Sequence, residues 1–262
     1  MDRQAVLAAF DEQIRRHPAA EAPGERVERD AAVVRFVAGE GGRSAVTWSA
    51  LNEATADAVI AATIDRFGRL GVDEWEWKHY SYDRPADLPR RLRAAGFTAE
   101  PSETLMVAEI EDLARDVAAP AGVRLLAVTE QRGVHALVCV HDEVFGEDHA
   151  ALGRELLARL ARRPPTVAAV VAVAGDTPIC AGRVEFHPGT EFASLWGGGT
   201  VRGWRGHGVF RALVAYRAAE ASARGFRYLQ VDASPESRPI LNRLGFVELA
   251  TTTPFIHPGR AT

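Results

Sequence analysis

Apolar residues in the second half of the chain recur with strand and helix periods in turn. Two apolar runs, at 167–174 and 179–186, are separated by the turn-forming sequence Gly-Asp-Thr-Pro, which predicts a β-hairpin. Before them, apolar residues recur every three or four positions and predict helices at 130–145 and 152–160. The other elements predicted in this half are strands at 123–127, 192–196 and 228–231, and helices at 208–224 and 235–244. This order of elements predicts a mixed α/β sheet flanked by helices.

The last part of the first half repeats the order of elements found near the end of the second half. The pattern predicts a strand at 44–48, a helix at 51–70 and an alternating strand at 74–82. A short helix at 86–95 then ends at a Gly-Phe pair, and a strand at 103–110 follows. In the second half, a strand, a short helix and a Gly-Phe pair also follow a long helix. One Gly-Phe pair is a common helix end, but the shared order of five elements favours a duplication.

A turn-forming stretch divides the two halves. Residues 115–123 read Arg-Asp-Val-Ala-Ala-Pro-Ala-Gly-Val, and the hydrophobic patterns on either side of them differ. We therefore place a domain boundary near 113–121 and expect one domain at 1–115 and a second at 120–262. The halves differ in one chemical respect, because only the second has a glycine- and arginine-rich connection between a strand and a helix.

Composition and charge narrow the classes of function. The 262 residues are 47% hydrophobic and 25% charged, as in ordinary globular proteins, and a formal net charge of −4 provides no overall positive field for a nucleic acid or an anionic membrane. The two cysteines, Cys139 and Cys180, lie in no metal-ligand spacing, so no metal site is expected. No apolar run is long enough to cross a bilayer, and the first residues contain no apolar signal segment, so we expect a cytoplasmic protein.

The segment from Trp196 to Phe210 combines glycines with arginines between a predicted strand and a predicted helix. Glycines allow backbone N–H groups to point into one concavity, and a helix N-terminus adds unpaired N–H groups and the positive end of a dipole. Arg202, Arg205 and Arg211 can add charge-assisted contacts to an anion. A flexible surface loop with incidental arginines is the competing interpretation, and the position between strand and helix favours a phosphate-binding loop. The segment matches neither the Walker motif nor the dinucleotide-binding motif.

Part of this segment, Arg205-Gly-His-Gly-Val-Phe210, resembles the acetyl-coenzyme A (acetyl-CoA) loop of the GNAT superfamily of N-acetyltransferases, whose pattern is Arg/Gln-x-x-Gly-x-Gly/Ala. Arg205 and Gly208 match this pattern, whereas Phe210 takes the place of the final small residue. The resemblance covers about residues 120–262 through the order of elements and through Leu241-Asn-Arg-Leu-Gly-Phe246, which is similar to the family's closing helix and turn. It implies tandem GNAT-like mixed sheets flanked by helices, with a degenerate first copy that lacks the loop.

The resemblance implies acetyl-CoA as co-substrate and no metal. The end of the loop strand would pair with the pantetheine arm, and the loop would surround the phosphates. The residues implied are Gly199, Thr200 and Val201 for the pantetheine arm, and Arg205, Gly206, His207, Gly208, Val209 and Phe210 for the phosphates. The activity implied is direct transfer of an acetyl group to a primary amine of a small molecule or peptide.

The residues that exchange protons would differ from the family's usual ones. Leu241 occupies the position at which many members have an acid tyrosine, so Ser237, water or no dedicated group would protonate the departing thiolate. Glu185, before the loop strand, and Asp232, at the end of the strand after the long helix, are the candidate general bases. Either carboxylate is also compatible with a solvated or salt-bridged role.

The acceptor and the partners are predicted only as classes. The acidic residues near Phe145 would suit a cationic amine, although they also suit a solvated helix end. They are Asp142, Glu143, Glu147 and Asp148. A non-catalytic acyl-CoA-binding sensor or interaction module is the alternative to an enzyme, because the acid tyrosine is missing, and a third interpretation is an interaction domain that binds no coenzyme. The fused halves are compatible with a monomer or a homodimer.

Overall fold

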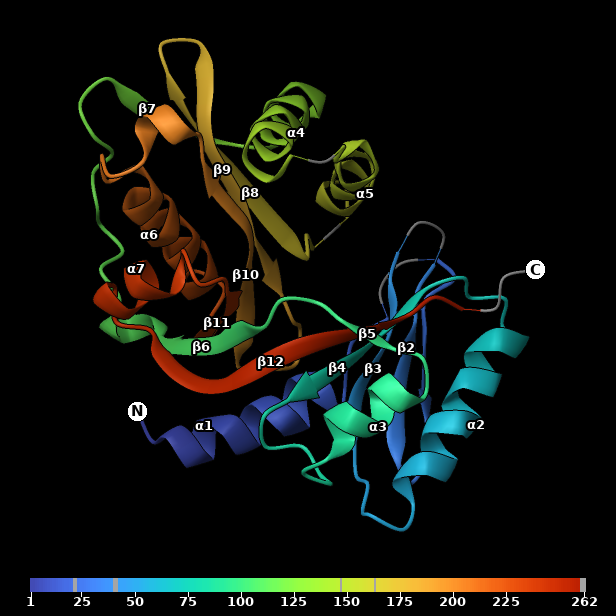
Figure 1. Ribbon diagram of the computed structural model, residues 1–262. Helices are drawn as coiled ribbons and strands as arrows, with labels where there is room; N and C mark the ends of the chain where they lie inside the picture. The colour runs from blue at the N-terminus through green and yellow to red at the C-terminus, as the bar shows by residue number, and fades with distance from the viewer. Residues whose placement is uncertain (21–22, 40–41, 147, 163, 260–262) are drawn as a thin grey trace. The chain divides into compact units, whose positions relative to one another are not determined.

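The computed structural model describes residues 1–20, 23–39, 42–146, 148–162 and 164–259 (Figure 1). The chain divides into two compact units, each made from more than one segment of the sequence. Unit 1 consists of Met1, Met106–Val231 and Pro239–Val247. Unit 2 consists of the described parts of Asp2–Leu105, Asp232–Arg238 and Glu248–Thr262. Each unit combines helices with a mixed sheet, which confirms the predicted fold class.

Unit 1 contains the elements predicted for the second half of the chain. Its helices are α4 (Gln131–Phe145), α5 (Ala150–Leu160), α6 (Val209–Ser222) and most of α7 (Arg238–Arg243), with the 3₁₀ turns η2 (Ile110–Asp112) and η3 (Arg202–Trp204). Its strands are β6 (Glu103–Glu109, from residue 106), β7 (Val123–Ala127), β8 (Val167–Ala174), β9 (Thr177–Phe186), β10 (Phe192–Thr200) and β11 (Tyr228–Ala233, up to residue 231). They follow the order β6-β11-β10-β9-β8-β7. Strands β7 to β10 are antiparallel neighbours, whereas β10 and β11 are parallel and joined by the crossover helix α6.

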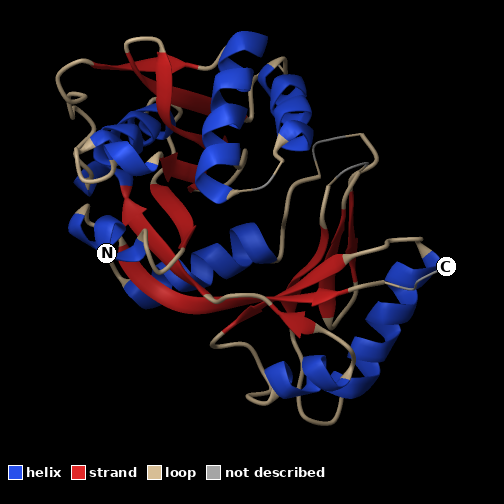
Figure 2. Cartoon of the chain, turned by 45° about the horizontal axis from the view of Figure 1, so that its top comes forward, coloured by secondary structure: helices blue, strands red, loops and turns tan. Residues whose placement is uncertain are grey.

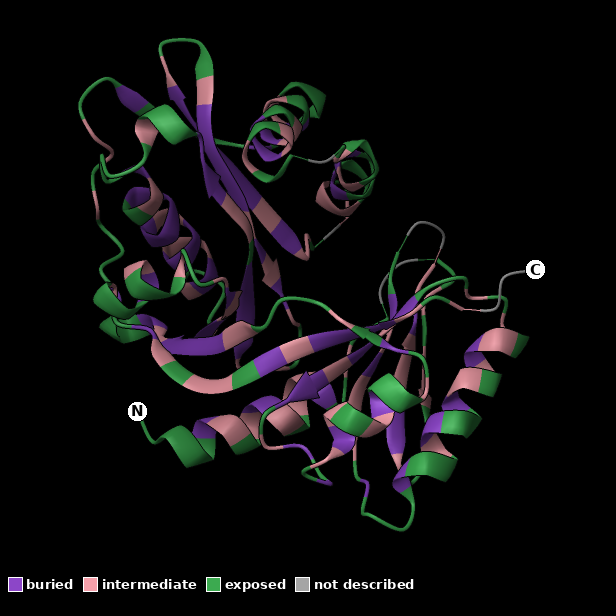
Figure 3. Cartoon of the chain, viewed as in Figure 1, coloured by how far each residue is buried: buried purple, intermediate pink, exposed green. Residues whose placement is uncertain are grey.

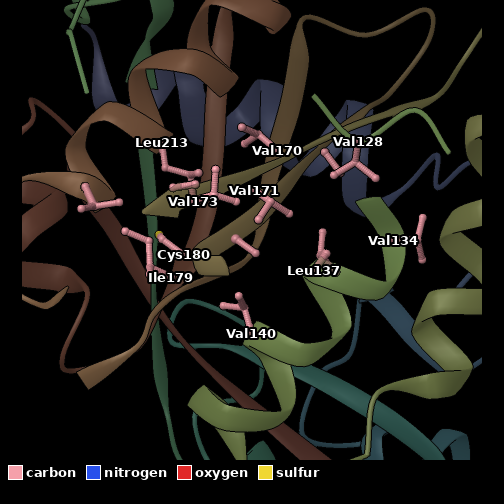
Figure 4. Packing of buried hydrophobic residues seen from close by; sticks show 14 of the residues in the cluster. Val128, Val134, Leu137, Val140, Val170, Val171, Val173, Ile179, Cys180 and Leu213 are labelled. Atoms are coloured by element: carbon pink, nitrogen blue, oxygen red, sulfur yellow. The ribbon is translucent and has the colours of Figure 1, made fainter. Parts of the chain in front are cut away.

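Helices cover both faces of the sheet in unit 1. Helices α4 and α5 lie on one face and α6 lies on the other (Figure 1, Figure 2). Strands β8 and β9 are buried along most of their length (Figure 3), which explains why their sequences are apolar runs rather than alternating patterns. Figure 4 shows this core, in which Leu137 and Val140 of α4, Leu213 of α6 and Cys180 of β9 pack together with the valines of β8. The predicted hairpin of β8 and β9 is confirmed.

Unit 2 repeats the strand–helix–strand arrangement of unit 1. Its helices are α1 (Arg3–Phe10), which continues into the π-helical turn η1 (Asp11–Arg15), α2 (Ala56–Arg69) and α3 (Leu88–Ala94). Its strands are β1 (Arg26–Arg29), β2 (Val33–Val37), β3 (Ser44–Ser49), β4 (Trp75–Tyr80), β5 (Thr98–Ala99) and β12 (Val247–His257, from residue 248). They follow the order β1-β2-β3-β4-β12, with β5 paired to β12. Because β3 and β4 are parallel and flank α2, as β10 and β11 flank α6, the predicted repetition of elements is confirmed.

The alternation of residues along β4 separates an aromatic face from a charged one. Trp75 is 1% exposed and stacks on Phe67 of α2, with ring centroids 4.3 Å apart. Trp77 lies on the same face and is fully buried. Glu76 and Lys78 alternate with these tryptophans and lie on the other face. The alternation predicted for this strand is therefore confirmed.

The last strand of each repeat belongs to the unit built mainly from the other half of the chain. The residues of β6 from 106 onward belong to unit 1, where the N–H of Ile110, the next residue, donates to Arg227 O at 2.8 Å. Strand β12, near the end of the chain, pairs with β4 in unit 2, with Phe255 opposite Trp77. The compact units therefore differ from the expected segments 1–115 and 120–262. Local sequence patterns could not predict this, because the pairing of a strand depends on distant segments.

Candidate functional site

Strands β10 and β11 separate partway along their length. Their parallel register ends at Ser194 opposite Gln230, although β10 continues to Thr200 and β11 to Ala233. On its other side, β10 stays paired with β9 to its end. The second half of β10 therefore has one edge without a neighbouring strand in the described part of the chain. The backbone groups on that edge can pair with an extended ligand.

The three glycines of β10 belong to the strand. The sequence predicted a strand at 192–196 followed by a loop, but β10 continues to Thr200, with a bulge between Trp196 and Gly199. Side chains of α4 and α6 approach these glycines so closely that a β-carbon would collide with them at Gly197 and Gly199 and would make a tight contact at Gly198. The distances from such a β-carbon are 2.5 Å from Gly197 to the His141 ring, 3.0 Å from Gly198 to the Phe210 ring and 2.8 Å from Gly199 to Val144. The ring of Phe210, which departs from the family pattern, thus uses space left by a glycine.

His141 of α4 fixes the backbone at the bulge. Its Nε2 lies 2.8 Å from the carbonyl oxygen of Gly197. Burial, assisted by the charge of Arg183, lowers the pKa of His141 to about 4, so the ring is neutral at neutral pH. Because a carbonyl oxygen only accepts hydrogen bonds, Nε2 carries the proton and donates it to Gly197. The conformation of the bulge therefore depends on a neutral histidine.

The loop after β10 has the backbone conformation of an anion site. Gly206 and Gly208 have φ angles of +79° and +83°, which residues with side chains rarely adopt. Helix α6 follows with Gly208 as its N-cap, and no side chain caps it. Its first internal hydrogen bond runs from Ala212 N–H to Gly208 O, at 3.2 Å. The N–H groups of the three residues between them have no intrahelical partner and lie at the positive end of the helix dipole.

Several residues that were predicted to contact acetyl-CoA form hydrogen bonds within the loop and to β9. Arg205 Nε donates to the carbonyl oxygen of Thr200 at 3.1 Å, and the Val201 N–H donates to Ile179 O of β9 at 2.9 Å. His207 Nδ1 donates to Arg205 O at 3.0 Å. These bonds tie the end of β10 to the loop and to β9. The preceding glycines of β10 are then the positions at which its open edge can bind a ligand.

The predicted phosphate-loop residues lie together at the start of α6. They are Arg205, Gly206, His207, Gly208, Val209 and Phe210. Arg202, Arg205 and Arg211 are exposed, and none of the ion pairs between described residues includes them. The loop thus presents backbone N–H groups together with positive charge that no described carboxylate neutralises, as a phosphate site requires.

Glu185, one of the two predicted bases, lies on β9 between two arginines. Arg183 Nε is 2.7 Å from one of its carboxylate oxygens, and Arg159 Nη1 is 3.0 Å from the other. Burial disfavours the charge of Glu185, but the two guanidinium groups outweigh burial and hold its pKa below the ordinary value. This geometry makes Glu185 a weak proton acceptor and a partner in an ion-pair network.

Asp232, the other predicted base, belongs to unit 2 and contacts the only lysine of the chain. Lys78 Nζ, on β4, lies 2.7 Å from Asp232 Oδ2, and the Asp232 side chain is 8% exposed. Burial disfavours the charge of Lys78, yet Asp232 and other neighbours raise the pKa of the ammonium group above its ordinary value. Asp232 Oδ1 is buried without a hydrogen-bond partner among the described residues. One oxygen of this carboxylate is therefore paired with the lysine, and the other has no partner among the described residues.

The two positions that the sequence analysis considered for the proton donor are Leu241, in α7, and Ser237, in the turn before it. Leu241 is 1% exposed and offers no proton. The Ser237 hydroxyl donates to Ser234 O at 3.3 Å within the turn that precedes α7. The Ser237 hydroxyl is therefore hydrogen-bonded within its own turn. Ser237 stays a predicted alternative donor of the proton to the thiolate.

The acidic residues near Phe145 contact the ends of helices. Asp142 Oδ1 lies 3.0 Å from the His149 ring, and Asp148 Oδ1 accepts a hydrogen bond from Ala150 N–H at 2.8 Å. Glu147 lies outside the described residues. Phe145 itself is 47% exposed. These contacts favour the helix-end interpretation of the two aspartates over acceptor binding.

Two residues at the glycine bulge were not predicted from the sequence. His141 and Arg217 are each 1% exposed, on the sheet-facing sides of α4 and α6. The available signal was a polar residue at an apolar position of each helix, since His141 follows Leu137 and Arg217 follows Leu213 by one turn. That signal identifies burial but not the strand that the side chain contacts.

The described residues contain no candidate metal cluster and no candidate membrane-spanning helix. No group of three or more histidine, cysteine, aspartate or glutamate side chains in the described ranges could hold a metal ion. No helix within those ranges is both long and apolar enough to span a bilayer.

Solved structures share this architecture over the whole chain. No family model and no curated protein sequence matches the chain. The structure is similar to a GCN5-related N-acetyltransferase from Kribbella flavida, with a TM-score of 0.71 and 17% identity over 99% of this chain and 96% of the other. A tandem GNAT protein from the clavulanic acid biosynthesis pathway has a TM-score of 0.63 and 13% identity, covering 99% and 95% of the two chains. A GCN5-related N-acetyltransferase from Sphaerobacter thermophilus has a TM-score of 0.61 and 12% identity, covering 99% and 93%. The chain therefore has the GNAT fold in its tandem form.

Proposed function

We propose that this chain transfers an acetyl group from acetyl-CoA directly to a primary amine of a small molecule or peptide. The observation that carries the proposal is the continuity of the open edge of β10 with the uncapped start of α6. A strand edge suits the amides of an extended pantetheine arm, and the helix N-terminus suits the phosphates that follow the arm. The similarity in fold to tandem GNAT proteins supports the same assignment.

In this proposal, the residues of the loop and the residues of β10 bind different parts of acetyl-CoA. The N–H groups at Gly206, Gly208 and the first turn of α6 bind the phosphates, with Arg205 adjoining them. Gly199 and the glycines before it pair with the pantetheine arm, while Thr200 and Val201 hold the end of the strand in place. The acceptor amine attacks the thioester without a covalent enzyme intermediate, so much of the rate comes from holding the two substrates together.

Glu185 and Asp232 remain the two candidate general bases in this proposal. Both oxygens of Glu185 contact arginines, which favour its charged form and weaken it as a base. Asp232 is also paired with a cation, since Lys78 Nζ lies 2.7 Å from its Oδ2, while its Oδ1 is buried without a hydrogen-bond partner among the described residues. We also propose a cytoplasmic protein that is a monomer or a homodimer, and light scattering would decide the oligomeric state.

Calorimetric titration with acetyl-CoA tests the phosphate site. The Gly208→Glu variant places a side chain and a negative charge at the N-cap of α6, and we expect it to weaken binding by about 100-fold or more. Gly189→Glu is the matched control, because Gly189 has a φ of +81°, close to the +83° of Gly208, and open space around it in the turn before β10. The control should bind acetyl-CoA as the natural chain does.

Three outcomes separate the candidate functions. Binding that only Gly208→Glu abolishes, together with acetylation of members of an amine panel, supports the enzyme. The same binding without turnover of any amine would favour an acyl-CoA sensor. No binding by the natural chain would reject both and leave an interaction domain.

A further inference from the structure

Arg217 of α6 is a buried cation in unit 1. Its Nε donates to Leu213 O at 3.2 Å and its Nη1 donates to Arg183 O at 3.3 Å. Its Nη2 is buried without a hydrogen-bond partner among the described residues. Burial lowers the pKa of Arg217 to about 10, which still leaves the guanidinium charged at neutral pH. A buried charge without a counter-ion is strongly unfavourable, so packing alone does not explain this residue.

The groups around Arg217 do not neutralise it. The titratable groups that act on it are Cys180 and Arg183, both on β9. Burial raises the pKa of Cys180, and its Sγ lies 3.1 Å from Thr200 Oγ1, so it is a thiol at neutral pH. Arg183 is itself a cation and bonds to Glu185. His141, on the opposite face of the bulge, is neutral. The described surroundings thus leave a positive charge inside unit 1.

This charge lies directly against the glycine bulge of β10. A β-carbon on Gly198 would lie 3.3 Å from Arg217 Nη2, and a β-carbon on Gly182 of β9 would lie 2.9 Å from Nη1. The guanidinium therefore fills the space that side chains would occupy at these two positions. A larger residue at either position would push the charge away from the strand.

The proposed function determines which part of acetyl-CoA comes closest to this charge. With the phosphates at the start of α6, the pantetheine arm runs back along β10 toward its glycines. The thioester sulfur is at the far end of that arm, so it lies at the bulge. This step rests on the proposed function, whereas the position and the charge of Arg217 do not.

The reaction creates a negative charge at the same place. When the amine attacks the carbonyl carbon, a carbon–nitrogen bond forms, the carbon–sulfur bond breaks and the electron pair goes to sulfur. The amine proton goes to the base, and CoA leaves as a thiolate. Leu241 cannot protonate this thiolate, but a fixed positive charge in a water-poor environment stabilises it without proton transfer. We propose that Arg217 acts through the glycine bulge to stabilise the CoA thiolate as the leaving group.

The pH dependence of product binding tests this role. If Arg217 favours the thiolate, bound CoA has a lower thiol pKa than free CoA, and its affinity rises with pH between the two values by up to about tenfold per unit. S-methyl-CoA has no thiol to ionise and serves as the reference ligand. We expect the ratio of the two dissociation constants to depend on pH in the natural chain. A ratio that is flat between about pH 6 and 9 would overturn the proposal.

Variants distinguish the charge from the fold. Arg217→Met should flatten the ratio while S-methyl-CoA still binds, whereas Arg224→Met removes an arginine that pairs with Glu220 just after α6 and should keep the slope. If Arg217→Met does not fold, Cys180→Asp introduces a neutralising carboxylate beside Arg217 and should flatten the ratio in the same way. A slope retained in either folded variant would overturn the proposal. Failure of both ligands to bind the natural chain would instead reject the proposed function.

Discussion

Replacing Gly197 by alanine tests whether packing requires glycine at the β10 bulge. Gly197 has a φ of +57°, and a β-carbon there would lie 2.5 Å from His141 Cε1 and 2.9 Å from its Nε2. Two independent costs follow, one from the backbone conformation and one from the collision. Gly206 provides the reference, because its φ is +79° and no atom lies within 4 Å of its β-carbon position.

The two substitutions therefore differ by the collision alone. Alanine in the left-handed region costs about 1 kcal/mol, and we expect this value for Gly206→Ala. In Gly197→Ala, the His141 ring must also move, which adds about 1–3 kcal/mol of overpacking. Losing the hydrogen bond from His141 to Gly197 O adds about 1 kcal/mol. We expect a total of about 3–5 kcal/mol for Gly197→Ala, against about 1 kcal/mol for the reference.

Thermal and urea-induced unfolding measure this difference. With about 2–4 °C per kcal/mol for a chain of this size, Gly206→Ala should lower Tm by about 2–4 °C and Gly197→Ala by about 6–20 °C. The double variant Gly197→Ala/His141→Ala should be more stable than the sum of the single effects implies, because the smaller side chain removes the collision. Equal losses in Gly197→Ala and Gly206→Ala, or strict additivity in the double variant, would refute the packing explanation.

Three further predictions concern carboxylates. Asp83→Ala should destabilise unit 2 by about 3 kcal/mol in urea unfolding, because it removes the more buried of the two carboxylates that pair with Arg15 at 2.8 Å and leaves only Asp11, and a loss below about 1 kcal/mol would contradict this. Burial raises the pKa of Glu103 to about 7, so the folded chain holds a proton that the unfolded chain releases near its ordinary pKa, and stability should fall as the pH rises between these values. Glu103→Gln should reduce this pH-dependent loss of unfolding free energy by about 1–2 kcal/mol, a discounted value because the side chain is partly exposed. An unchanged dependence of stability on pH would contradict the raised pKa of Glu103. If either carboxylate is the general base, its amide variant, Asp232→Asn or Glu185→Gln, should lower kcat with saturating substrates by about 100-fold or more, and unchanged turnover in both variants would remove both residues as bases.

Elements with a strong local period could be predicted from the sequence. Strands β7 and β8 begin and end where the apolar runs predicted, and α4 and α6 agree with their predicted helices to within two residues. The pattern is reliable there because one element buries one continuous stripe of side chains against one sheet. Helix α1 and strands β1, β2 and β12 were not predicted, although the structure contains them.

The exchange of β6 and β12 shows a limit of local patterns. Both strands follow a Gly-Phe pair that ends a short helix, so each strand comes directly after its own repeat along the chain. Strand β12 pairs with β4 through residues more than 170 positions apart, such as Thr252 and Tyr80. The hydrophobic content of a strand predicts that the strand is buried, but it does not predict which other strand it pairs with. A duplication can therefore be predicted from the sequence although the compact units do not coincide with the two repeats.

The glycine-rich segment needs glycine for two different structural reasons, which the composition of the segment does not distinguish. Its sequence suggests one flexible phosphate loop from Trp196 onward, yet the structure divides it at Thr200. Before that residue, glycine is favoured because a β-carbon would collide with His141 or Val144 and would make a tight contact with Phe210. After it, glycine is needed because the loop takes φ values near +80° in open space. The first requirement arises from helices distant in the sequence and the second from the local backbone, so only the second could be predicted. The same packing brings Arg217 against β10, which is why this charge is visible in the structure and not in the motif.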